Sequence, residues 1–455
     1  MKRHSGRQRM NMIKRLVIGG SLVLMLAGCD SLFGEGAFFG DKPPPPLPGK
    51  RISVLLAQAA LEPDPGAAAT EILLPPPTPN PDWPEAGGYA NHAMHHIEVG
   101  DRLVRAWTAS IGHKSTEDER LIVQPIVAEG HVFTMDSEND IAAFDAKTGA
   151  EIWSVDVTPD DEDDGHFGGG IAYEFGRVVA TTGFGQVIAL DAKTGKVLWR
   201  RDFNTPFRTA PTLRGGRVFT VSVTNRLEVL AADDGRTLWS HSGIEETASI
   251  LGGASPAVDG NVVVVAYSSG ELFALRVENG RELWSTSLTA QRRSNVVTTL
   301  STIRGRPIID RGLVIAVSNA GLLTAIDLRT GRRVWEREIG SMESPWVAGD
   351  YIFLLSNSSD LLALGRTTGR IYWVTTLPQW ENPEERVKRI LWTGPILASD
   401  RLILAGSNGE ALAVSPYTGK ILGREQMPDR VSIPPIVADR SIYFLSDDAE
   451  LVAYR

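Results

Sequence analysis

The stretch DAKTGAEIW (residues 145–153) returns almost unchanged as DAKTGKVLW (residues 191–199), 46 positions later. In both stretches a tryptophan follows the glycine by four residues. The same spacing recurs at DDGRTLW (233–239), ENGRELW (278–284), RTGRRVW (329–335) and TTGRIYW (367–373), while YTGKILG (417–423) keeps the glycine but has Gly423 in place of the tryptophan. Self-similarity at such a spacing indicates a repeat architecture.

Each repeated glycine lies between two short apolar runs that alternate with polar residues. This pattern predicts a β-hairpin whose turn needs one residue at positive φ, which glycine adopts at no steric cost. The tryptophan then falls on the second strand, where its ring can fill the space against a neighbouring sheet. A small residue stands six positions before each glycine and leaves room for that ring: Ala143, Ala189, Val229, Ala274, Ala325, Ala363 and Ala413.

A second series marks where each repeat begins. Its members are Pro125, Gly170, Pro211, Pro256, Pro307, Pro345, Pro395 and Pro435. These eight starts face seven glycine turns, so the last repeat is one strand short at the C-terminus. The stretch LVRAWTASIG (103–112) supplies that strand, because Trp107 precedes Trp153 by the repeat spacing. We therefore predict an all-β domain over residues 100–455, an eight-bladed β-propeller of four-stranded blades.

The N-terminal segment has the pattern of a bacterial lipoprotein signal. Basic residues precede the apolar run LVIGGSLVLMLA, which is too short to span a membrane, and the run leads into LAGC (26–29). We expect a signal peptide over residues 1–28 and lipidation of Cys29, the only cysteine of the chain. Residues 29–99 contain PPPPLP and PPPTPNP and are expected to form a Pro-rich tether. Within it, residues 51–61 could form a short helix or strand.

The charge balance excludes some partners. The whole chain has a formal net charge of −9, and removal of residues 1–28 would leave 40 Lys and Arg against 55 Asp and Glu. Such an acidic protein is a poor match for nucleic acid or an anionic membrane surface. A single cysteine also allows no disulfide framework.

Two polar clusters could carry chemistry. His92, His95 and His96 have a spacing that could present metal ligands, but no cysteine or carboxylate accompanies them, so we interpret them as histidines on the rim. The acidic run PDDEDDG (159–165) lacks the alternating oxygen ligands of a calcium loop and is interpreted as a solvated loop between blades. We expect no metal site, no cofactor and no catalytic residue.

The phrase ALDAKTGKVLW resembles the tryptophan-docking repeat of the pyrroloquinoline quinone (PQQ) dehydrogenase propellers. The enzymes of that superfamily hold a calcium-bound quinone covered by two adjacent cysteines, which this chain lacks. The lipobox, SLFG, AWTASIG and LLTAIDLRTGRRVWEREIGS together resemble the outer-membrane protein assembly factor B family. That resemblance implies a non-catalytic scaffold lipoprotein of the β-barrel assembly machinery. Its implied partners are the periplasmic domains of the central assembly protein and nascent outer-membrane proteins.

The resemblance also implies a partner-binding site. In the family, a loop matching SILGGASP (249–256) contacts the central assembly protein, which selects Ser249, Ile250, Leu251 and Gly252 here. A second, acidic contact aligns with Thr302 and Arg304, where the charge is reversed. Alternatively, Ile250 and Leu251 begin an inner strand or fill a junction between blades. The implied location is the periplasmic side of the outer membrane, although Asp30 after the lipidated cysteine is a signal for inner-membrane retention in enteric bacteria. The alternatives to a scaffold are a PQQ-dependent dehydrogenase and a propeller that binds another envelope ligand.

Overall fold

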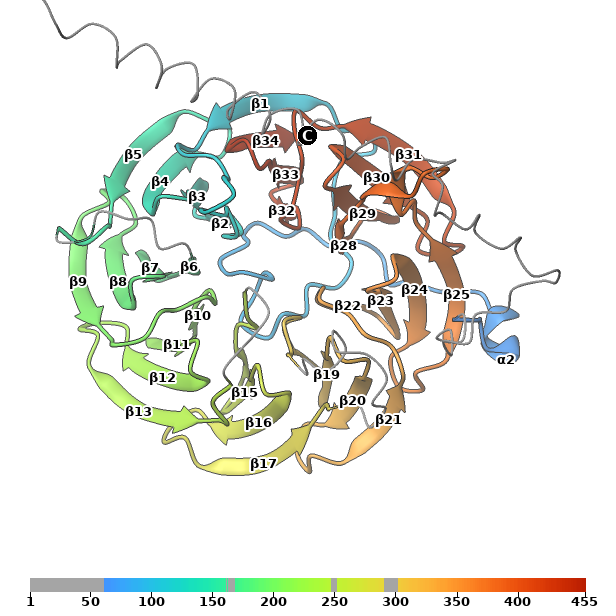
Figure 1. The fold of residues 1–455 in the computed structure, drawn as a ribbon, viewed down its shortest axis with the longest axis horizontal. Coiled ribbons are helices and arrows are strands. Elements are labelled where there is room, and N and C mark those ends of the chain that lie inside the picture. The colour runs from blue at the N-terminus through green and yellow to red at the C-terminus, as the bar shows by residue number, and fades with distance from the viewer. Residues whose placement is uncertain (1–60, 161, 163–167, 247–251, 290–301) are drawn as a thin grey trace, which may run out of the picture. The chain divides into compact units, whose positions relative to one another are not determined.

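Eight antiparallel sheets of four strands surround a central channel in the computed structural model (Figure 1). The structure describes residues 61–160, 162, 168–246, 252–289 and 302–455. Within each blade the strands follow one another from the channel outward, each hydrogen-bonded to the next. This arrangement confirms the predicted eight-bladed propeller.

Blades 1 to 4 consist of β2–β5 (Ile126–Ala128, His131–Met135, Asp140–Asp145, Glu151–Asp156), β6–β9 (Gly169–Glu174, Arg177–Thr182, Gln186–Asp191, Val197–Asp202), β10–β13 (Thr212–Leu213, Arg217–Val221, Arg226–Ala231, Thr237–Ser242) and β14–β17 (Ala257–Asp259, Val262–Ala266, Glu271–Arg276, Glu282–Ser287). Blades 5 to 8 consist of β18–β21 (Ile308–Asp310, Leu313–Val317, Leu323–Asp327, Arg333–Arg337), β22–β25 (Trp346–Ala348, Tyr351–Leu355, Asp360–Gly365, Ile371–Thr376), β28–β31 (Trp392–Ala398, Arg401–Gly406, Glu410–Val414, Ile421–Gln426) and β32–β34 (Ile436–Ala438, Ser441–Leu445, Glu450–Tyr454) with β1 (Arg105–Ser110).

Two further elements lie outside the blades. Helix α2 (Pro65–Ala68) packs beside β25, and the hairpin β26–β27 (Trp380–Asn382, Val387–Arg389) leaves the ring between blades 6 and 7. No helix within the described ranges has the length and apolar character to cross a lipid bilayer.

The repeated glycine and tryptophan join neighbouring blades. Gly149 has φ +74°, and a Cβ built on it would lie 2.6 Å from the ring of Trp107, which belongs to the preceding blade. The indole N–H of Trp107 donates to the carbonyl of Ala146, at the start of the same turn, over 3.2 Å. The six other repeats use the same contact, with Trp153, Trp199, Trp239, Trp284, Trp335 and Trp373. The small residue opposite is also confirmed, since Ala143 pairs with Trp153 across the sheet.

Strand β1 closes the ring by pairing antiparallel with β34, with Trp107 opposite Ala453. The outer two strands of blade 8 therefore come from opposite ends of the domain and have no turn between them. A tryptophan on blade 7 would have no glycine turn to pack on. This explains why position 423 is glycine, with nothing within 4 Å of where its Cβ would lie.

Residues 61–99 pack against the propeller, with α2 beside β25 and residues 78–99 inside the ring, which corrects the expectation that they belong to an extended tether. Trp83 and Ile97 are each only 1 % exposed and join the largest apolar cluster of the protein. In Figure 1 the later, light-blue part of this segment is the coil inside the ring, whereas α2 lies outside the ring beside β25. The prolines did not prevent burial, because the segment forms isolated hydrogen bonds with different blades and needs no continuous helix or strand of its own.

We call residues 78–99 the plug. The plug contacts the inner part of every blade, and most of these contacts satisfy backbone groups that an inner strand would otherwise leave unpaired. From blade 1 to blade 8 the partners are Trp83 with Val127, Pro84 with Tyr173, Glu85 with Leu213, Ala90 with Val258, Asn91 with Ile309, His95 with Trp346, Ile97 with Leu397, and Asn80 with Asp439.

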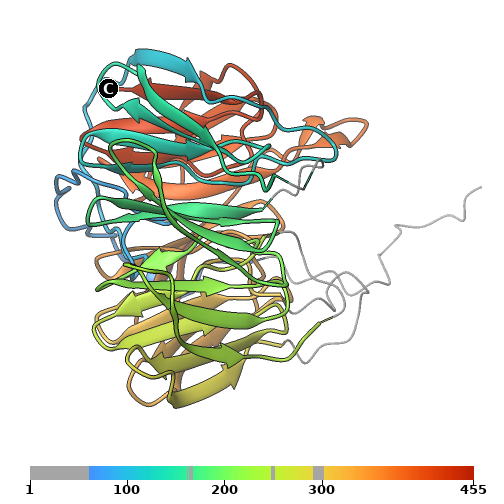
Figure 2. The same ribbon diagram turned by 90° about the vertical axis from the view of Figure 1, so that its left-hand side faces the viewer.

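The two faces of the ring therefore differ. The plug lies on the side of the turns that follow the inner strands, and we call this side the plug face. Connections between successive blades lie on the opposite side, which we call the loop face. Figure 2 shows the blue N-terminal segment on one face and the orange hairpin β26–β27 projecting from the other.

Candidate functional site

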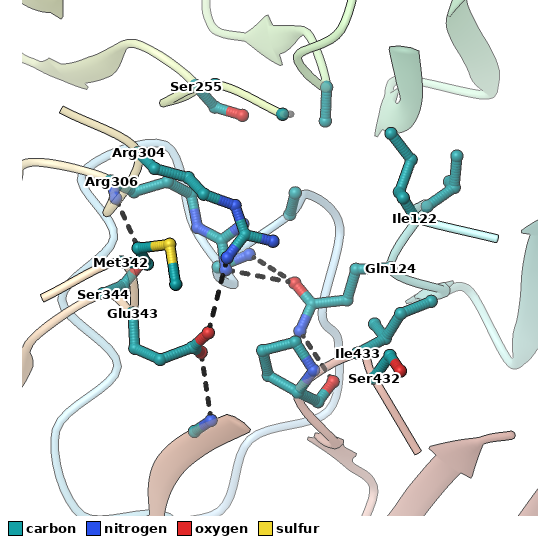
Figure 3. Close-up of a pocket in the computed structure, with 18 of the residues that line it drawn as sticks. Ile122, Gln124, Ser255, Arg304, Arg306, Met342, Glu343, Ser344, Ser432 and Ile433 are labelled. Carbon is teal, nitrogen blue, oxygen red and sulfur yellow. Dashed lines mark hydrogen bonds and ion pairs between the residues drawn. The ribbon is translucent and has the colours of Figure 1, made fainter. Parts of the chain in front are cut away.

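A cavity of about 390 Å³ opens at the loop-face end of the channel. Its walls come from the connections that precede the inner strands of several blades, and its floor is formed by the plug residues Trp83, Gly87 and His92. Figure 3 shows side chains from blades on opposite sides of the ring pointing into this space. The volume is within the range of sites that bind small ligands or single side chains.

Arg304 and Arg306 lie in the connection before β18 and extend side by side into the cavity (Figure 3). The Nη1 atom of Arg304 is 3.6 Å from the Oε1 atom of Glu343. The other oxygen of Glu343 accepts from the hydroxyl of Thr393 over 2.9 Å and from the backbone N–H of Gly394 over 3.2 Å. Glu343 is thus held in place and partly neutralises Arg304.

Arg306 is less well compensated. No carboxylate of the described chain lies within 4 Å of its guanidinium, and its buried Nε atom has no hydrogen-bond partner there. The contact of Nη2 with Gln124 Oε1 is long, at 3.5 Å, and this oxygen already accepts from the backbone N–H of Gly87 over 2.9 Å. Burial lowers the pKa of Arg306 to about 10, which still leaves the group charged at neutral pH.

The floor of the cavity holds two more buried nitrogen atoms without partners among the residues described, Trp83 Nε1 and His92 Nε2. His92 Nδ1 lies 2.8 Å from the carbonyl oxygen of Pro307 and must donate to it, so Nε2 carries the lone pair in the neutral ring. Burial and then the charge of Arg306 lower the pKa of His92 to about 3. The floor therefore offers an N–H donor from Trp83 and an acceptor from His92.

The structure brings together part of the partner-binding site predicted from the sequence. Gly252 lies against Arg304, whose Nε atom is 3.2 Å from where a Cβ of residue 252 would be. Thr302 is buried nearby and lines a smaller hollow with Gly252. Ser249, Ile250 and Leu251 lie outside the described residues, as does Cys29. The use of these residues to bind a partner stays a prediction.

The three histidines are not rim residues, which corrects the interpretation from the sequence. His92 and His96 are buried in the plug, and His95 is partly covered, with its Nε2 atom 3.4 Å from Asp310 Oδ1. His96 Nδ1 contacts the carbonyl of Pro75 at 2.7 Å, and its Nε2 accepts from the backbone N–H of Asp400 over 2.9 Å. These bonds anchor the plug. Most of the acidic run 159–165 lies outside the described residues.

Arg306, Glu343 and Gln124 were not singled out from the sequence. The one local signal was RGRP (304–307), in which two arginines alternate directly before the proline that starts a blade. Gln124 occupies the equivalent place before Pro125, and its amide donates to the carbonyl of Pro434 over 3.1 Å. Their convergence depends on ring closure, which brings distant connections to one axis.

The residues around the cavity do not fit a calcium-bound quinone. The two carboxylates that line the cavity already accept hydrogen bonds within the protein. Glu343 accepts from Thr393 and Gly394, and Asp447 accepts from the hydroxyl of Ser432 over 2.9 Å. Among the described residues the one group of potential metal ligands is His113, Asp136 and Asp140, and none of these lines the cavity. Asp136 is used to shape a turn, because it accepts three backbone N–H groups.

Comparison with protein families agrees with the propeller architecture. The family model described as "Outer membrane protein assembly factor BamB" matches residues 137–375, more than half of the chain. A model of the β-propeller domain of glucose, ethanol and alcohol dehydrogenases matches residues 94–175. An uncharacterized protein of Rickettsia prowazekii is 26% identical over 63% of this chain and 69% of its own length. The assembly factor of Escherichia coli is 26% identical over 75% of this chain and 86% of its own length.

Solved structures agree on the fold. BamB from Moraxella catarrhalis superimposes with a TM-score of 0.65 at 19% identity, covering 78% of this chain and all of that one. Quinohemoprotein alcohol dehydrogenase from Comamonas testosteroni gives a TM-score of 0.64 at 14% identity over 82% and 80% of the two chains. Because both identities are low and the two scores nearly equal, these likenesses show the propeller fold and do not separate a scaffold from an enzyme.

Proposed function

Because this chain belongs to the family of outer membrane protein assembly factor BamB, we propose that it is a non-catalytic scaffold of the β-barrel assembly machinery. In this role it binds the periplasmic domains of the central assembly protein. It aids the folding and insertion of nascent outer-membrane β-barrel proteins. The assembly factors of several bacteria that match along most of their length support the proposal.

The loop face is the surface that we assign to the central assembly protein. The observation that supports this assignment is the meeting of Gly252 and Arg304, which are 52 positions apart in the sequence and are both selected by the family resemblance. An exposed apolar side chain, Ile244, lies at the end of β13 on the same face and is 60% exposed. Apolar residues at such loops are typical of partner contacts. We place Ser249, Ile250, Leu251 and Thr302 in the same contact region.

Photo-crosslinking in cells tests this assignment. A photoreactive amino acid at Ile244 should capture the central assembly protein. The matched control is Phe175, which is also apolar, 77% exposed and located in a turn of blade 2, but on the plug face. Capture from Ile244 and not from Phe175 is the expected result. Equal capture from both positions, or from Phe175 alone, would remove the loop face from the interface.

We further propose that the chain is anchored to the outer membrane through lipid on Cys29 and faces the periplasm. A basic, then apolar segment that ends in LAGC supports lipidation, and the single cysteine leaves one acceptor. Metabolic labelling with an acyl analogue should mark the wild-type protein and not Cys29→Ser. Fractionation of the two membranes then decides the sorting: if Asp30 retains the protein at the inner membrane, Asp30→Ser should move it outward.

A PQQ-dependent alcohol dehydrogenase is the second candidate, and the match of residues 94–175 to a dehydrogenase propeller favours it. The cavity argues against it, because four arginines and two carboxylates, both already hydrogen-bonded, line it. Purified protein supplied with PQQ and Ca²⁺ should show no dye-linked oxidation of ethanol or glucose. Activity that is lost on chelation would overturn the non-catalytic role.

A further inference from the structure

Two arginines of the ring, the buried Arg366 and the half-buried Arg306, differ in how their charge is compensated. Arg366 is buried beside two carboxylates, with Nη1 3.4 Å from Asp310 and Nη2 3.7 Å from Asp350. Arg306 lies in the cavity with no carboxylate within 4 Å among the described residues and with its Nε atom unpartnered. An unpaired charge taken out of water is costly unless something compensates it. Arg306 is therefore a charge that the described chain compensates only in part, through the field of Glu343, which makes no ion pair with it within 4 Å.

The surroundings of Arg306 are basic overall. Arg304 lies beside it, and the single carboxylate close to the pair, Glu343, is already bonded to Arg304, Thr393 and Gly394. Four arginines and two carboxylates line the cavity, although the chain as a whole carries a net charge of −9. This concentration of positive charge at one end of the channel favours an anionic ligand.

The floor and rim of the site suit a small anion on an apolar stem. The guanidinium of Arg306 lies close over Gly87, where any Cβ would be 2.7 Å from Nε, so the plug closes the cavity beneath it. The open side is the loop face, where Met342 supplies apolar surface beside the arginines and Ile122 and Ile433 supply it across the cavity (Figure 3). A carboxylate can accept two parallel N–H bonds from an arginine, and an apolar rim suits the stem that carries it.

We propose that the loop-face cavity is a carboxylate-binding site in which Arg306 and Arg304 hold the charged tip of an acidic side chain from a polypeptide. This inference goes beyond the proposed function, because it depends on the cavity and not on which partner the loop face binds. A free carboxylic acid shares the same chemistry, and the experiment below separates the two sources.

The binding test uses the purified full-length protein and three probes. These probes are the peptide N-acetyl-Gly-Glu-Gly-amide, its Gln counterpart, and butyrate. Binding is detected by NMR, through the signals of the Trp83 indole N–H and of the arginine Nε–H groups. The Glu peptide should shift these signals, and the Gln peptide should bind roughly tenfold or more weakly, the loss expected for a charge-assisted hydrogen bond. Arg306→Gln should abolish the difference between the peptides. If both peptides bind alike, or neither binds, the site is not a carboxylate site. If butyrate binds as well as the Glu peptide, the carboxylate site stands and the polypeptide source is overturned.

A second measurement does not depend on finding the right probe. Without ligand, Arg306→Met removes an uncompensated charge and should raise the melting temperature, whereas Arg366→Met breaks ion pairs and should lower it. The Glu peptide should raise the melting temperature of the wild type and leave that of Arg306→Met unchanged, because a ligand stabilises the state that binds it. A lower melting temperature for Arg306→Met would show that its charge is compensated within the protein and would overturn the proposal.

Discussion

On the plug face the channel is filled by residues 78–99 of the chain itself, whereas on the loop face it opens into the cavity around Arg304 and Arg306. The inner strands have free edges at both ends of the channel. At one end these edges pair with the plug, and at the other the groups that point inward include the guanidinium of Arg306, which no carboxylate of the described residues approaches within 4 Å. The blades alone therefore do not fill the centre of the ring: one end is packed by the plug, and the other holds the cavity that we propose as a binding site.

The largest expected effect is on the plug face. Trp83 is 1% exposed, bridges to Val127 and stacks on Trp346 with a centroid distance of 6.2 Å. Trp83→Ala should lower the free energy of unfolding by about 3–5 kcal/mol, the usual range for a buried tryptophan. Urea denaturation measures it. The control is Trp380→Ala in β26, a half-buried tryptophan on the hairpin of the loop face, which should cost clearly less. Equal losses would mean that the plug is an accessory and not part of the core.

A smaller effect on stability should distinguish the turns of the plug face that lie next to the channel from those at the outside of the ring. Gly149 and Gly130 both lie in turns of blade 1, at φ +74° and +77°. A Cβ on Gly149 would be 2.6 Å from Trp107, whereas nothing lies within 4 Å of one on Gly130. Gly130→Ala should cost roughly 1–2 kcal/mol of backbone strain, and Gly149→Ala about 1–3 kcal/mol more from the clash. In a Trp107→Ala background this excess should vanish, which a double-mutant cycle in thermal unfolding would reveal. An excess that persists would assign it to something other than tryptophan docking.

The outer contacts between neighbouring blades could be predicted from the sequence, because the same glycine and tryptophan recur in each repeat. The spacing from Gly149 to Trp153 repeats around the ring, and position 423 departs from it where ring closure removes the turn. A period of this kind reports geometry directly, since equivalent residues occupy equivalent places in each blade. The closing strand was predicted by the same spacing, through Trp107.

The centre could not be predicted in this way. The plug meets each blade through a different residue and backbone group, so its sequence carries no period, and its prolines resemble those of a solvated linker. The positions of His92, His95 and His96 were predicted wrongly for the same reason, because they belong to the plug and follow no period. For the cavity, resemblance selected Arg304 and Gly252, but the surroundings of Arg306 include Gln124 and Glu343, which only the folded ring brings near.

Acidification should weaken the plug. The pKa of His92 is lowered by burial to about 3, so between roughly pH 6.5 and pH 3 the unfolded chain binds a proton that the folded chain does not. The free energy of unfolding should therefore fall as pH falls, by up to about 1.4 kcal/mol per pH unit from this group. His92→Asn is the matched variant, because residue 92 has φ +61°, which asparagine tolerates. Urea denaturation between pH 7 and pH 5 should give a shallower slope for His92→Asn. Parallel slopes would show that His92 is protonated in the folded ring.

The loop face should respond to pH with the opposite sign and the smallest effect. Burial lowers the pKa of His113, but the hydrogen bond to Asp136 and the charges of Asp136, Glu138 and Asp140 outweigh burial and raise it. The folded state then holds a proton more tightly than the unfolded chain. This contribution is complete below pH 6.5 and is lost as pH rises through the raised pKa. Because the side chain is half exposed, the contribution should stay below about 1 kcal/mol. NMR titration should place the pKa of His113 above 6.5, and the difference in melting temperature between wild type and His113→Gln should shrink from pH 6 to pH 8.5. A pKa at or below 6.5 would contradict the assignment and leave His92 as the histidine that sets the pH response of the ring.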